Sequence, residues 1–422
     1  MTSQLNITSL ITLLLIVLLD VIAVCGLKRT FPKFYSLHRR LIRNAFMIQA
    51  IVSVIIMIGG FLFQHRVRDY RLLIMYSYFF GVVTALYIPK AIYAAFLFVD
   101  CILSTVSKWD RRLFDRFPRG SRRIIAKCGL CASLFFVCLF LLGILIGRNY
   151  YTVEQVEINF ADLPRAFNGY KIVHISDIHA GSFAGSVKRF QKAVDLINGQ
   201  YPDLIIFTGD MVNNFADEIT SLIPVFSQIN APERKFAVLG NHDYGGYFKW
   251  DTPADSVANH EALENAIEQM GFKLLNNQSV IINHYNTDRI ALVGVENWGT
   301  EQRYPKRADL EKATESVQDI PFKILLTHNP LFWSEYVEGK SDITLTLSGH
   351  THGMQMGIKL GKNRYSPASL LRNPHWAGLY QTGRQFLYVN RGLGVIGFPG
   401  RVGMLPEISV ITLWKEISPE QP

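Results

Sequence analysis

Five short apolar runs between residues 170 and 347 each end in a polar motif, and this repeated arrangement limits the fold more than any other feature of the chain. The runs are 170–175, 204–207, 235–239, 324–326 and 343–347. Short apolar runs bounded by turn residues are typical of buried strands. Open α/β sheets bind ligands at the carboxyl ends of their strands, so the sequence predicts an α/β fold with one functional sheet edge.

The polar motifs carry carboxylate, amide and imidazole groups that we expect to meet at this edge. Gly209 allows a tight turn that directs Asp210 inward, and His350 and His352 share one side of an extended segment. A hydrolytic site with two metal ions needs such ligands and one shared carboxylate, and a set without sulfur suits Mn, Fe, Zn or Mg. The candidate side chains are Asp177, His179, Asp210, Asn241, His242, His328, His350 and His352.

Strand and helix signals alternate after residue 150, which favours βαβ units and a largely parallel sheet. We therefore predict an α/β sandwich with two packed sheets. Helices are expected at 186–198, 217–228 and 260–270, and strands at 156–160, 171–176, 204–208, 235–239, 273–282, 289–295, 322–327, 343–348, 385–390 and 408–414.

Residues 1–150 contain four apolar segments long enough to cross a bilayer, which takes about 20 residues. The third is interrupted by Pro89-Lys90, and we predict one kinked helix because no polar turn would hold a hairpin. Asp100 near its end is expected to be solvated. We therefore predict an all-α, four-helix transmembrane region at 1–150 and a catalytic domain at 151–422. The segments are Leu5–Leu27, Ala45–Phe63, Leu72–Thr105 and Ile124–Ile146.

Positive charge is concentrated in this first region. Residues 1–150 hold 19 Lys or Arg and 5 Asp or Glu, whereas residues 151–422 hold 24 and 29. The acidic second part argues against nucleic acid as a partner, which needs clustered positive charge. Basic loops stay in the cytoplasm, and the loops after the first and third segments hold 13 basic residues against 4 on the other side. We expect a multi-pass protein of the cell membrane, the inner membrane in bacteria, with an extracytoplasmic catalytic domain.

The ordered motifs resemble the five-block signature of the calcineurin-like metallophosphoesterases over about residues 170–415. The later stretch 388–408, which contains Arg391-Gly392 and Pro399-Gly400-Arg401, is similar to the membrane-associated branch that includes YkuE-like and YaeI-like bacterial phosphodiesterases. The resemblance implies a four-layer α-β-β-α sandwich. It also implies that a metal-activated hydroxide hydrolyses a phosphoric ester without a covalent enzyme intermediate.

The resemblance assigns a role to each motif residue. His242 would contact the phosphoryl oxygen or protonate the leaving group, and Asp243 would hydrogen-bond to His242 and orient it. Two divalent metal ions are implied, with these ligands: Asp177, His179 and His352 for the first ion, Asp210 as the bridge, and Asn241, His328 and His350 for the second.

Three further polar residues are candidates for substrate binding, namely Asn214, Tyr244 and Arg391. A turn or helix-cap role for Asn214 and a packing role for Tyr244 are the alternatives. The loop 366–380 is apolar, and either a lid that admits a lipid or ordinary packing explains it.

These features favour a membrane-anchored metal-dependent phosphoesterase, with manganese among the candidate metals. Its substrate is expected to be a phosphodiester or pyrophosphate of a lipid or envelope metabolite, next to the lipid bilayer. A sugar-nucleotide lipid pyrophosphatase that faces the cytoplasm is the alternative among enzymes, and the charge count opposes it. The alternative outside enzymes is a membrane scaffold or sensor whose metal site binds a ligand.

Overall fold

The computed structural model divides into two compact units, which are described separately. The first contains residues 1–64 and 75–143, and the second contains residues 65–74 and 144–422. The structure describes residues 2–416 apart from 64–66, 110–118, 184–185, 232–233, 286–287, 300–305, 362, 368 and 370–373.

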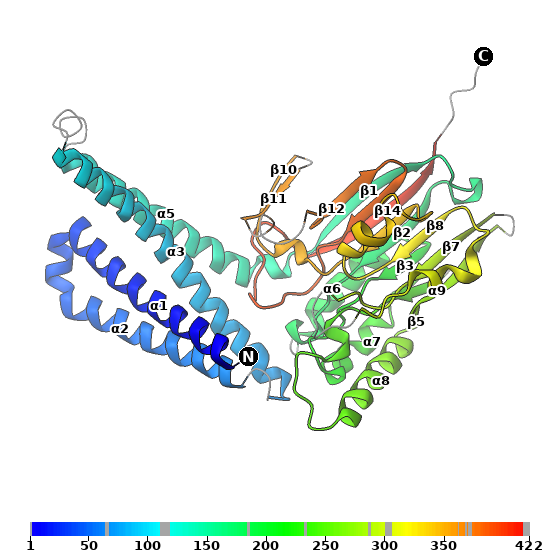
Figure 1. Ribbon diagram of the computed structural model, residues 1–422, viewed down its shortest axis with the longest axis horizontal. Helices are drawn as coiled ribbons and strands as arrows, with labels where there is room; N and C mark the ends of the chain where they lie inside the picture. The colour runs from blue at the N-terminus through cyan, green and yellow to red at the C-terminus, as the bar shows by residue number, and fades with distance from the viewer. Residues whose placement is uncertain are drawn as a thin grey trace, which may run out of the picture. The chain divides into compact units, whose positions relative to one another are not determined.

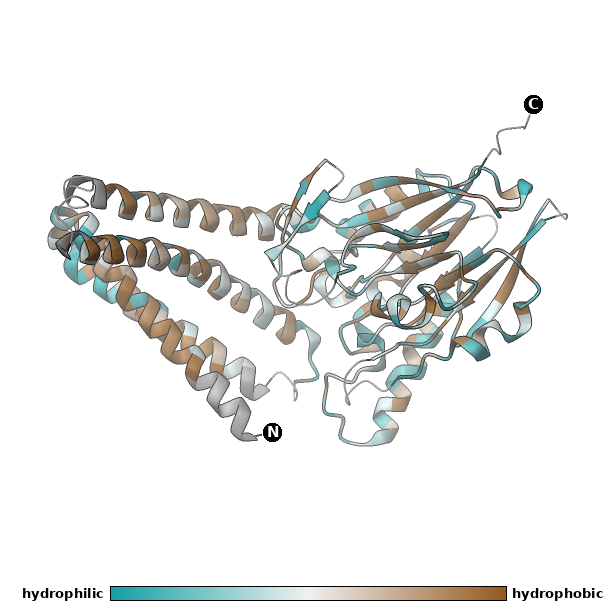
Figure 2. Ribbon diagram, turned by 45° about the horizontal axis from the view of Figure 1, so that its top comes forward, coloured by the Kyte–Doolittle hydropathy of each residue, from teal (hydrophilic) through white to brown (hydrophobic). Residues whose placement is uncertain are grey.

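The first unit consists of long apolar helices, coloured mostly brown in Figure 2. They are α1 (Thr2–Thr30), α2 (Pro32–Phe63), α3 (Tyr70–Trp109) and α5 (Arg119–Leu145). Each contains a segment long and apolar enough to cross a membrane. The prediction that the third segment is one helix is confirmed, since α3 continues through Pro89.

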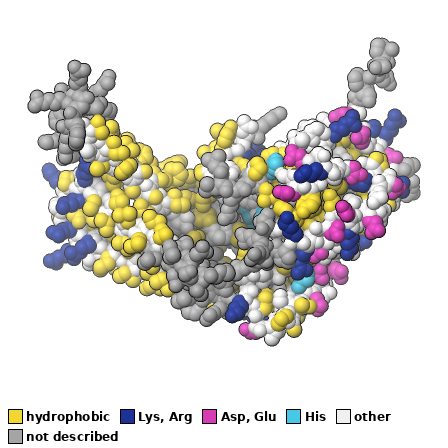
Figure 3. Space-filling model, viewed as in Figure 1, with side chains coloured by type: hydrophobic (Ala, Val, Ile, Leu, Met, Phe, Trp, Pro, Cys, Tyr) yellow, Lys and Arg dark blue, Asp and Glu magenta, His cyan; other side chains and the backbone are white. Residues whose placement is uncertain are grey.

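The basic run after the first helix was predicted to be a loop, and this was wrong. Only Phe31 separates α1 from α2, and the sole departure from helical backbone within α2 is at His38, with φ −109° and ψ 18°. The basic residues of the run are exposed, and Figure 3 shows Lys and Arg side chains gathered at one end of the helical unit. The positive charge of this run is therefore carried by helix ends rather than by a loop, and the basic run predicted after the third segment lies largely outside the described residues.

Buried ion pairs join the helices of the first unit. The Lys90 ammonium of α3 pairs with the Asp20 carboxylate of α1, which also accepts a 2.8 Å hydrogen bond from the Tyr87 hydroxyl. Asp100 is fully buried and lies 2.7 Å from the Arg29 guanidinium, which corrects the expectation that it is solvated. Charged groups within apolar helices are costly unless they pair with one another.

Two six-stranded sheets form the second unit, together with a separate two-stranded hairpin. The first sheet has the order β1 (Thr152–Phe160), β14 (Glu407–Lys415), β2 (Tyr170–Ile175), β3 (Leu204–Phe207), β4 (Arg234–Ala237) and β5 (Phe272–Leu274). The second has the order β12 (Gly378–Thr382), β13 (Gln385–Val389), β9 (Leu345–Ser348), β8 (Lys323–Leu326), β7 (Asp288–Gly294) and β6 (Gln278–His284). The hairpin is β10 (Ile358–Leu360) and β11 (Asn363–Tyr365).

The two sheets pack face to face, and helices cover their outer faces (Figure 1). Residues such as Ile206 of β3 and Leu326 of β8 share one buried cluster between the sheets. Their neighbours point outward, because side chains alternate across a strand: Phe207 packs with α6 (Val187–Asn198), α7 (Ile223–Phe226) and α8 (Pro253–Gln269). The second sheet is covered by α9 (Leu310–Thr314) and a π-helical turn, Trp333–Val337. The predicted four-layer sandwich is confirmed.

The two sheets are largely parallel, as predicted, whereas three element predictions differ from the structure. Strands β2 to β5 are parallel, as are β7, β8, β9 and β13, but β14, β6 and β12 run antiparallel to their neighbours β2, β7 and β13. The predicted strand 273–282 is two strands in different sheets, because Asn277 turns the chain with a φ of 53°. The predicted helix 217–228 is a 3-10 helix, Ala216–Leu222, followed by α7. Strands β10 to β12 were not predicted.

We predict that Lys90→Met lowers the free energy of unfolding by about 3–5 kcal/mol, because it leaves the Asp20 carboxylate buried and unpaired. The double variant Asp20→Leu with Lys90→Met should recover most of this loss, since neither charge then remains. Unfolding of the full chain in mixed detergent micelles measures both. A double variant as unstable as the single one would contradict the pairing.

Candidate metal centre

The motif residues lie directly after parallel strands, as predicted, and their backbone is strained. Positive φ angles occur at Asp177 (49°), His179 (45°), Asp210 (59°), His350 (69°) and His352 (53°). A side chain disfavours this left-handed conformation, and such residues cluster at functional sites because surrounding contacts must hold them there. The turns after β2, β3 and β9 therefore direct their side chains toward the site, and their strained backbone lowers local stability.

Two glycines let these turns pack against one another. Gly209 has a φ of 93°, and a Cβ there would lie 2.4 Å from the Gly240 nitrogen. A Cβ on Gly349 would lie 2.3 Å from Oδ2 of Asp177. Both distances are shorter than any side chain tolerates, so the carboxylates approach the neighbouring turns only because glycine stands at these positions.

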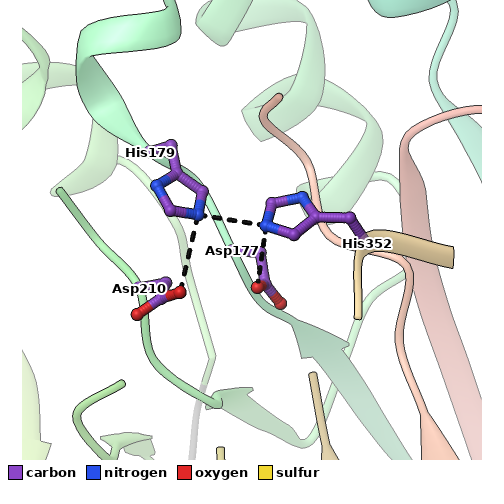
Figure 4. A group of neighbouring side chains, drawn as sticks. All are labelled: Asp177, His179, Asp210 and His352. Atoms are coloured by element: carbon purple, nitrogen blue, oxygen red, sulfur yellow. Dashed lines mark hydrogen bonds and ion pairs between the residues drawn. The ribbon is translucent and has the colours of Figure 1, made fainter. Parts of the chain in front are cut away.

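Four buried side chains converge on one point in Figure 4, namely Asp177, His179, Asp210 and His352. The Nε2 atoms of His179 and His352 are 3.0 Å apart. Nε2 of His352 lies 3.2 Å from Oδ1 of Asp177, and Nε2 of His179 lies 3.5 Å from Oδ2 of Asp210. Two imidazole nitrogens and two carboxylates that face one point are suited to bind a divalent cation.

A second group shares Asp210 with the first and adds His328 and His350. Oδ2 of Asp210 lies 3.1 Å from Nε2 of His328, and that nitrogen lies 3.1 Å from Nδ1 of His350. The same carboxylate oxygen therefore faces a histidine from each group. This is the arrangement expected of a carboxylate shared by two metal sites.

Asn241 supplies a further test of whether a cation fits. Its side-chain oxygen is buried and has no hydrogen-bond partner within the described part of the chain. The amide nitrogen of the same side chain donates a 2.7 Å hydrogen bond to the Tyr247 hydroxyl. Burying an unpaired carbonyl oxygen costs free energy, and a hard cation would satisfy it. The donor set thus fits a metal ion, and Tyr247 fixes which end of the amide is free.

The electrostatics of the site are dominated by Asp210 and His328. Burial favours a neutral Asp210, but the charges of His328 and His242 hold its pKa well below the usual value. Burial likewise opposes a charged His328, yet the adjacent Asp210 raises the pKa of His328 to about 9. In the absence of metal, a proton on His328 therefore balances part of the carboxylate charge. A cation that binds there must displace this proton.

His242 lies beside the ligands and is held from three sides. Its Nδ1 lies 2.8 Å from the backbone oxygen of Asn213, and its backbone nitrogen donates to Oδ1 of Asp210. The Tyr247 ring stacks on its imidazole, with ring centres 4.2 Å apart and planes 16° apart. The carbonyl of Asn213 accepts from a protonated Nδ1, which leaves Nε2 as the free nitrogen.

Asp243 does not orient His242, contrary to what the resemblance implied. Its carboxylate accepts hydrogen bonds of 2.8–3.2 Å from the backbone nitrogens of residues 210–212 and of Gly240. Asp243 therefore fixes the turn after β3 and through it Asp210. The residue that orients His242 is Asn213.

Tyr244 and Arg391 already have side-chain partners in the protein, whereas the buried side-chain oxygen of Asn214 has none within the described residues. The Tyr244 hydroxyl donates to Glu296, and its ring stacks on His260. Asn214 is 9% exposed, and its backbone nitrogen donates to Glu218. Arg391 is 2% exposed and pairs with two carboxylates, those of Glu407 and Glu154. Substrate binding by these residues stays a prediction.

Sequence reasoning missed three residues that support the site. Tyr247 holds Asn241 and His242, and Oδ1 of Asn213 lies 3.1 Å from Nδ1 of His179. Glu218 accepts hydrogen bonds from the backbone nitrogens of residues 213–215. Glu218 lies three residues after Phe215, the N-cap of its 3-10 helix, but Phe215 lacks the side-chain oxygen of a capping box, so the sequence carried only half of this signal.

The sandwich and its buried ligand groups define a metal-dependent hydrolase. Two family models cover most of the chain: "Calcineurin-like phosphoesterase" matches residues 170–354, and "Probable Calcineurin-like phosphoesterase, transmembrane domain" matches residues 5–148. The chain belongs to the calcineurin-like phosphoesterase family and is a membrane metallophosphoesterase.

Relatives with known sequences extend beyond bacteria. The chain is 32% identical over 274 residues to the uncharacterized metallophosphoesterase YkuE of Bacillus subtilis, a match that covers 62% of this chain and 86% of the relative. It is 30% identical over 335 residues to the transmembrane protein with metallophosphoesterase domain of Bos taurus, with 76% and 71% covered. The UDP-2,3-diacylglucosamine pyrophosphatase LpxG of Chlamydia muridarum is 29% identical over 302 residues, with 59% and 87% covered.

We predict that Tyr247→Phe weakens the binding of manganese to the full chain about 10-fold, because outer hydrogen bonds orient metal ligands. The variant keeps the ring that stacks on His242 and removes only the hydroxyl that holds Asn241. Calorimetric titration of the metal-free protein measures the change. Tyr244→Phe is the matched control, since its hydroxyl contacts Glu296 instead. Equal affinity in wild type and Tyr247→Phe would show that the hydroxyl does not position Asn241.

Proposed function

We propose that this chain is a membrane-anchored phosphoesterase with two divalent metal ions, which hydrolyses a phosphodiester or pyrophosphate of a lipid or envelope metabolite. Residues 1–150 would be the anchor and residues 151–422 the catalytic domain. The proposal is carried by one observation: a single oxygen of Asp210 faces His179 at 3.5 Å and His328 at 3.1 Å. That placement suits a carboxylate which belongs to two metal sites at once.

Each ligand role follows from this shared oxygen. Asp177, His179 and His352 hold the first ion with Asp210, and Asn241, His328 and His350 hold the second with the same carboxylate. Mn, Fe, Zn and Mg all suit these donors. When bound, the two ions lower the pKa of a water molecule and neutralise charge on the phosphoryl oxygens.

The remaining chemistry belongs to the side chains around the ligands. With Nδ1–H donating to the Asn213 carbonyl, the doubly protonated imidazole of His242 presents Nε2–H either as a hydrogen-bond donor to a phosphoryl oxygen or as the acid that protonates the leaving group. Tyr247 keeps this imidazole in one plane by stacking on it. Asp243 acts indirectly, because it holds the backbone from which Asp210 projects.

The names of relatives support a lipid-linked phosphoester as the substrate. Two chlamydial relatives, 29% and 30% identical, are UDP-2,3-diacylglucosamine pyrophosphatases, and the relative YaeI of Escherichia coli, 28% identical, is a phosphodiesterase. The four apolar helices of this chain bring its catalytic unit to a bilayer. A substrate confined to that bilayer fits both observations.

The side of the membrane separates our proposal from its nearest alternative. The charge count favours an extracytoplasmic catalytic domain, whereas a sugar-nucleotide lipid pyrophosphatase would need a cytoplasmic one. We predict that a carboxyl-terminal fusion to alkaline phosphatase, which is active only outside the cytoplasm, gives activity, and that a fluorescent protein which folds only in the cytoplasm stays dark. The reverse pattern would favour the cytoplasmic pyrophosphatase.

We predict that the purified full chain hydrolyses bis-p-nitrophenyl phosphate with manganese, and that Asp210→Asn lowers the rate at least about 1000-fold, since both metal sites lose their shared charge. Asp195→Asn, on the exposed side of α6, is the control and should keep the wild-type rate. Turnover that survives Asp210→Asn would refute the shared site. A wild-type protein that binds metal without turnover would favour the scaffold or sensor.

A further inference from the structure

The β10–β11 hairpin has one face anchored to the domain. The two strands pair with Ile358 opposite Tyr365 and Lys359 opposite Arg364. Lys359 and Arg364 therefore share one face, and both reach the carboxylate of Glu154 in β1, at 2.7 Å and 3.6 Å. The hairpin is held by charge on this side.

The other face of the hairpin is open and mostly apolar, with Asn363 opposite Leu360 as its polar member. Ile358, Leu360 and Tyr365 are 61%, 63% and 55% exposed. The hairpin pairs with neither six-stranded sheet and stands apart from them in Figure 1. Clustered apolar side chains on a surface mark a site of interaction, and these three follow the ligand His352 by 6 to 13 residues.

The hairpin is tied to the point where the chain leaves its last membrane-spanning segment. That segment is Ile124–Asn149, and β1 begins at Thr152. Glu154 is only five positions after Asn149, so at most about 18 Å of extended chain lies between them. The apolar face thus cannot lie far from the end of the span.

A second set of contacts fixes the base of the hairpin to the same segment. A Cβ on Gly147 would lie 2.1 Å from the backbone oxygen of Arg401, so the two backbones are in close contact. The next residue, Val402, accepts a 2.9 Å hydrogen bond from the backbone nitrogen of Gly357, immediately before β10. Two independent routes therefore connect the hairpin to residues 147–154.

The metal centre lies at the same edge of the sheet. Thr152 at the start of β1 is opposite Glu407 of β14, and Ser409 of β14 is opposite His174 of β2. The start of β1 is therefore level with the carboxyl end of β2, where Asp177 begins the ligand set. The chain enters the catalytic domain at its metal edge.

We propose that the β10–β11 hairpin inserts Ile358, Leu360 and Tyr365 into the headgroup region of the phospholipid bilayer and holds the metal edge against it. Tyr suits this position, since its ring is apolar and its hydroxyl is polar. The metal centre then meets phosphoesters at headgroup depth. This proposal rests on the proposed function for its substrate, but the contact with lipid is independent of turnover.

The test uses the full chain with its five cysteines, Cys25, Cys101, Cys128, Cys131 and Cys138, replaced by alanine. An environment-sensitive fluorophore is attached at Tyr365→Cys, and the protein is placed in nanodiscs of phosphatidylethanolamine and phosphatidylglycerol. A nitroxide on the lipid headgroup should quench the label at least about twofold, because interfacial side chains sit at that depth.

Tyr285→Cys is the matched control. Tyr285 is 79% exposed and follows β6, and β6 pairs antiparallel with β7, which runs parallel to the ligand-bearing strand β8. It therefore lies at the edge opposite the metal centre, and its label should not be quenched. Absent quenching at residue 365, or equal quenching at both residues, would overturn the proposal. A change in the fluorescence at residue 365 that occurs without nitroxide and increases with protein concentration would also overturn it, because it indicates contact with a second copy of the chain.

A variant separates this proposal from the failure of the proposed function. Ile358→Asp should reduce the quenching at residue 365 to the level of the control while hydrolysis of bis-p-nitrophenyl phosphate stays within about twofold, because interfacial binding depends on buried apolar area. If Ile358→Asp leaves the quenching unchanged, the hairpin does not insert. Absence of turnover in every variant would refute the proposed phosphoesterase activity, and the quenching result would remain valid.

Discussion

The structure depends on one carboxylate, that of Asp210, which must stand between two groups of histidines. A buried charge in that position is tolerated only when opposite charge and hydrogen-bond donors surround it. His328 and the backbone nitrogen of His242 provide these contacts. Left-handed backbone at Asp177, His179, His350 and His352 and glycine at the adjoining turns are the means by which β2 and β9 deliver their side chains to this carboxylate.

Support for the site comes mainly from backbone groups, and this explains why the ligands can be strained and still be well placed. Asp243 holds the turn after β3 through backbone nitrogens, and Asn213 holds His242 through its backbone oxygen. Arg401, which is 1% exposed, donates to the backbone oxygens of Gly394 and His352. The contacts of Asp243 and Arg401 fix loops rather than ligand side chains, so the strain is balanced by hydrogen bonds formed when the whole domain folds.

Much of the fold and of the site could be predicted from the sequence, because the pattern of apolar runs and terminal motifs is local. The parts of the fold and of the site that could not be predicted also have physical reasons. The split of 273–282 between two sheets depends on the turn at Asn277, and hydrophobicity is similar on both sides of it. The role of Asp243 could not be read from its position next to His242, since three of its four partners lie 31–33 residues away. Tyr247 resembles any aromatic residue of a loop until its hydroxyl is seen beside Asn241.

The short linker from Asn149 to the start of β1 at Thr152 has a consequence for kinetics. A catalytic unit on so brief a tether samples a thin layer of solution, and it would encounter the lipid-linked substrate proposed above by lateral diffusion in two dimensions. Its saturation is then governed by molecules per area of membrane, and diluting the vesicles leaves the rate per enzyme unchanged. Diluting the substrate among other lipids within the same vesicle lowers it.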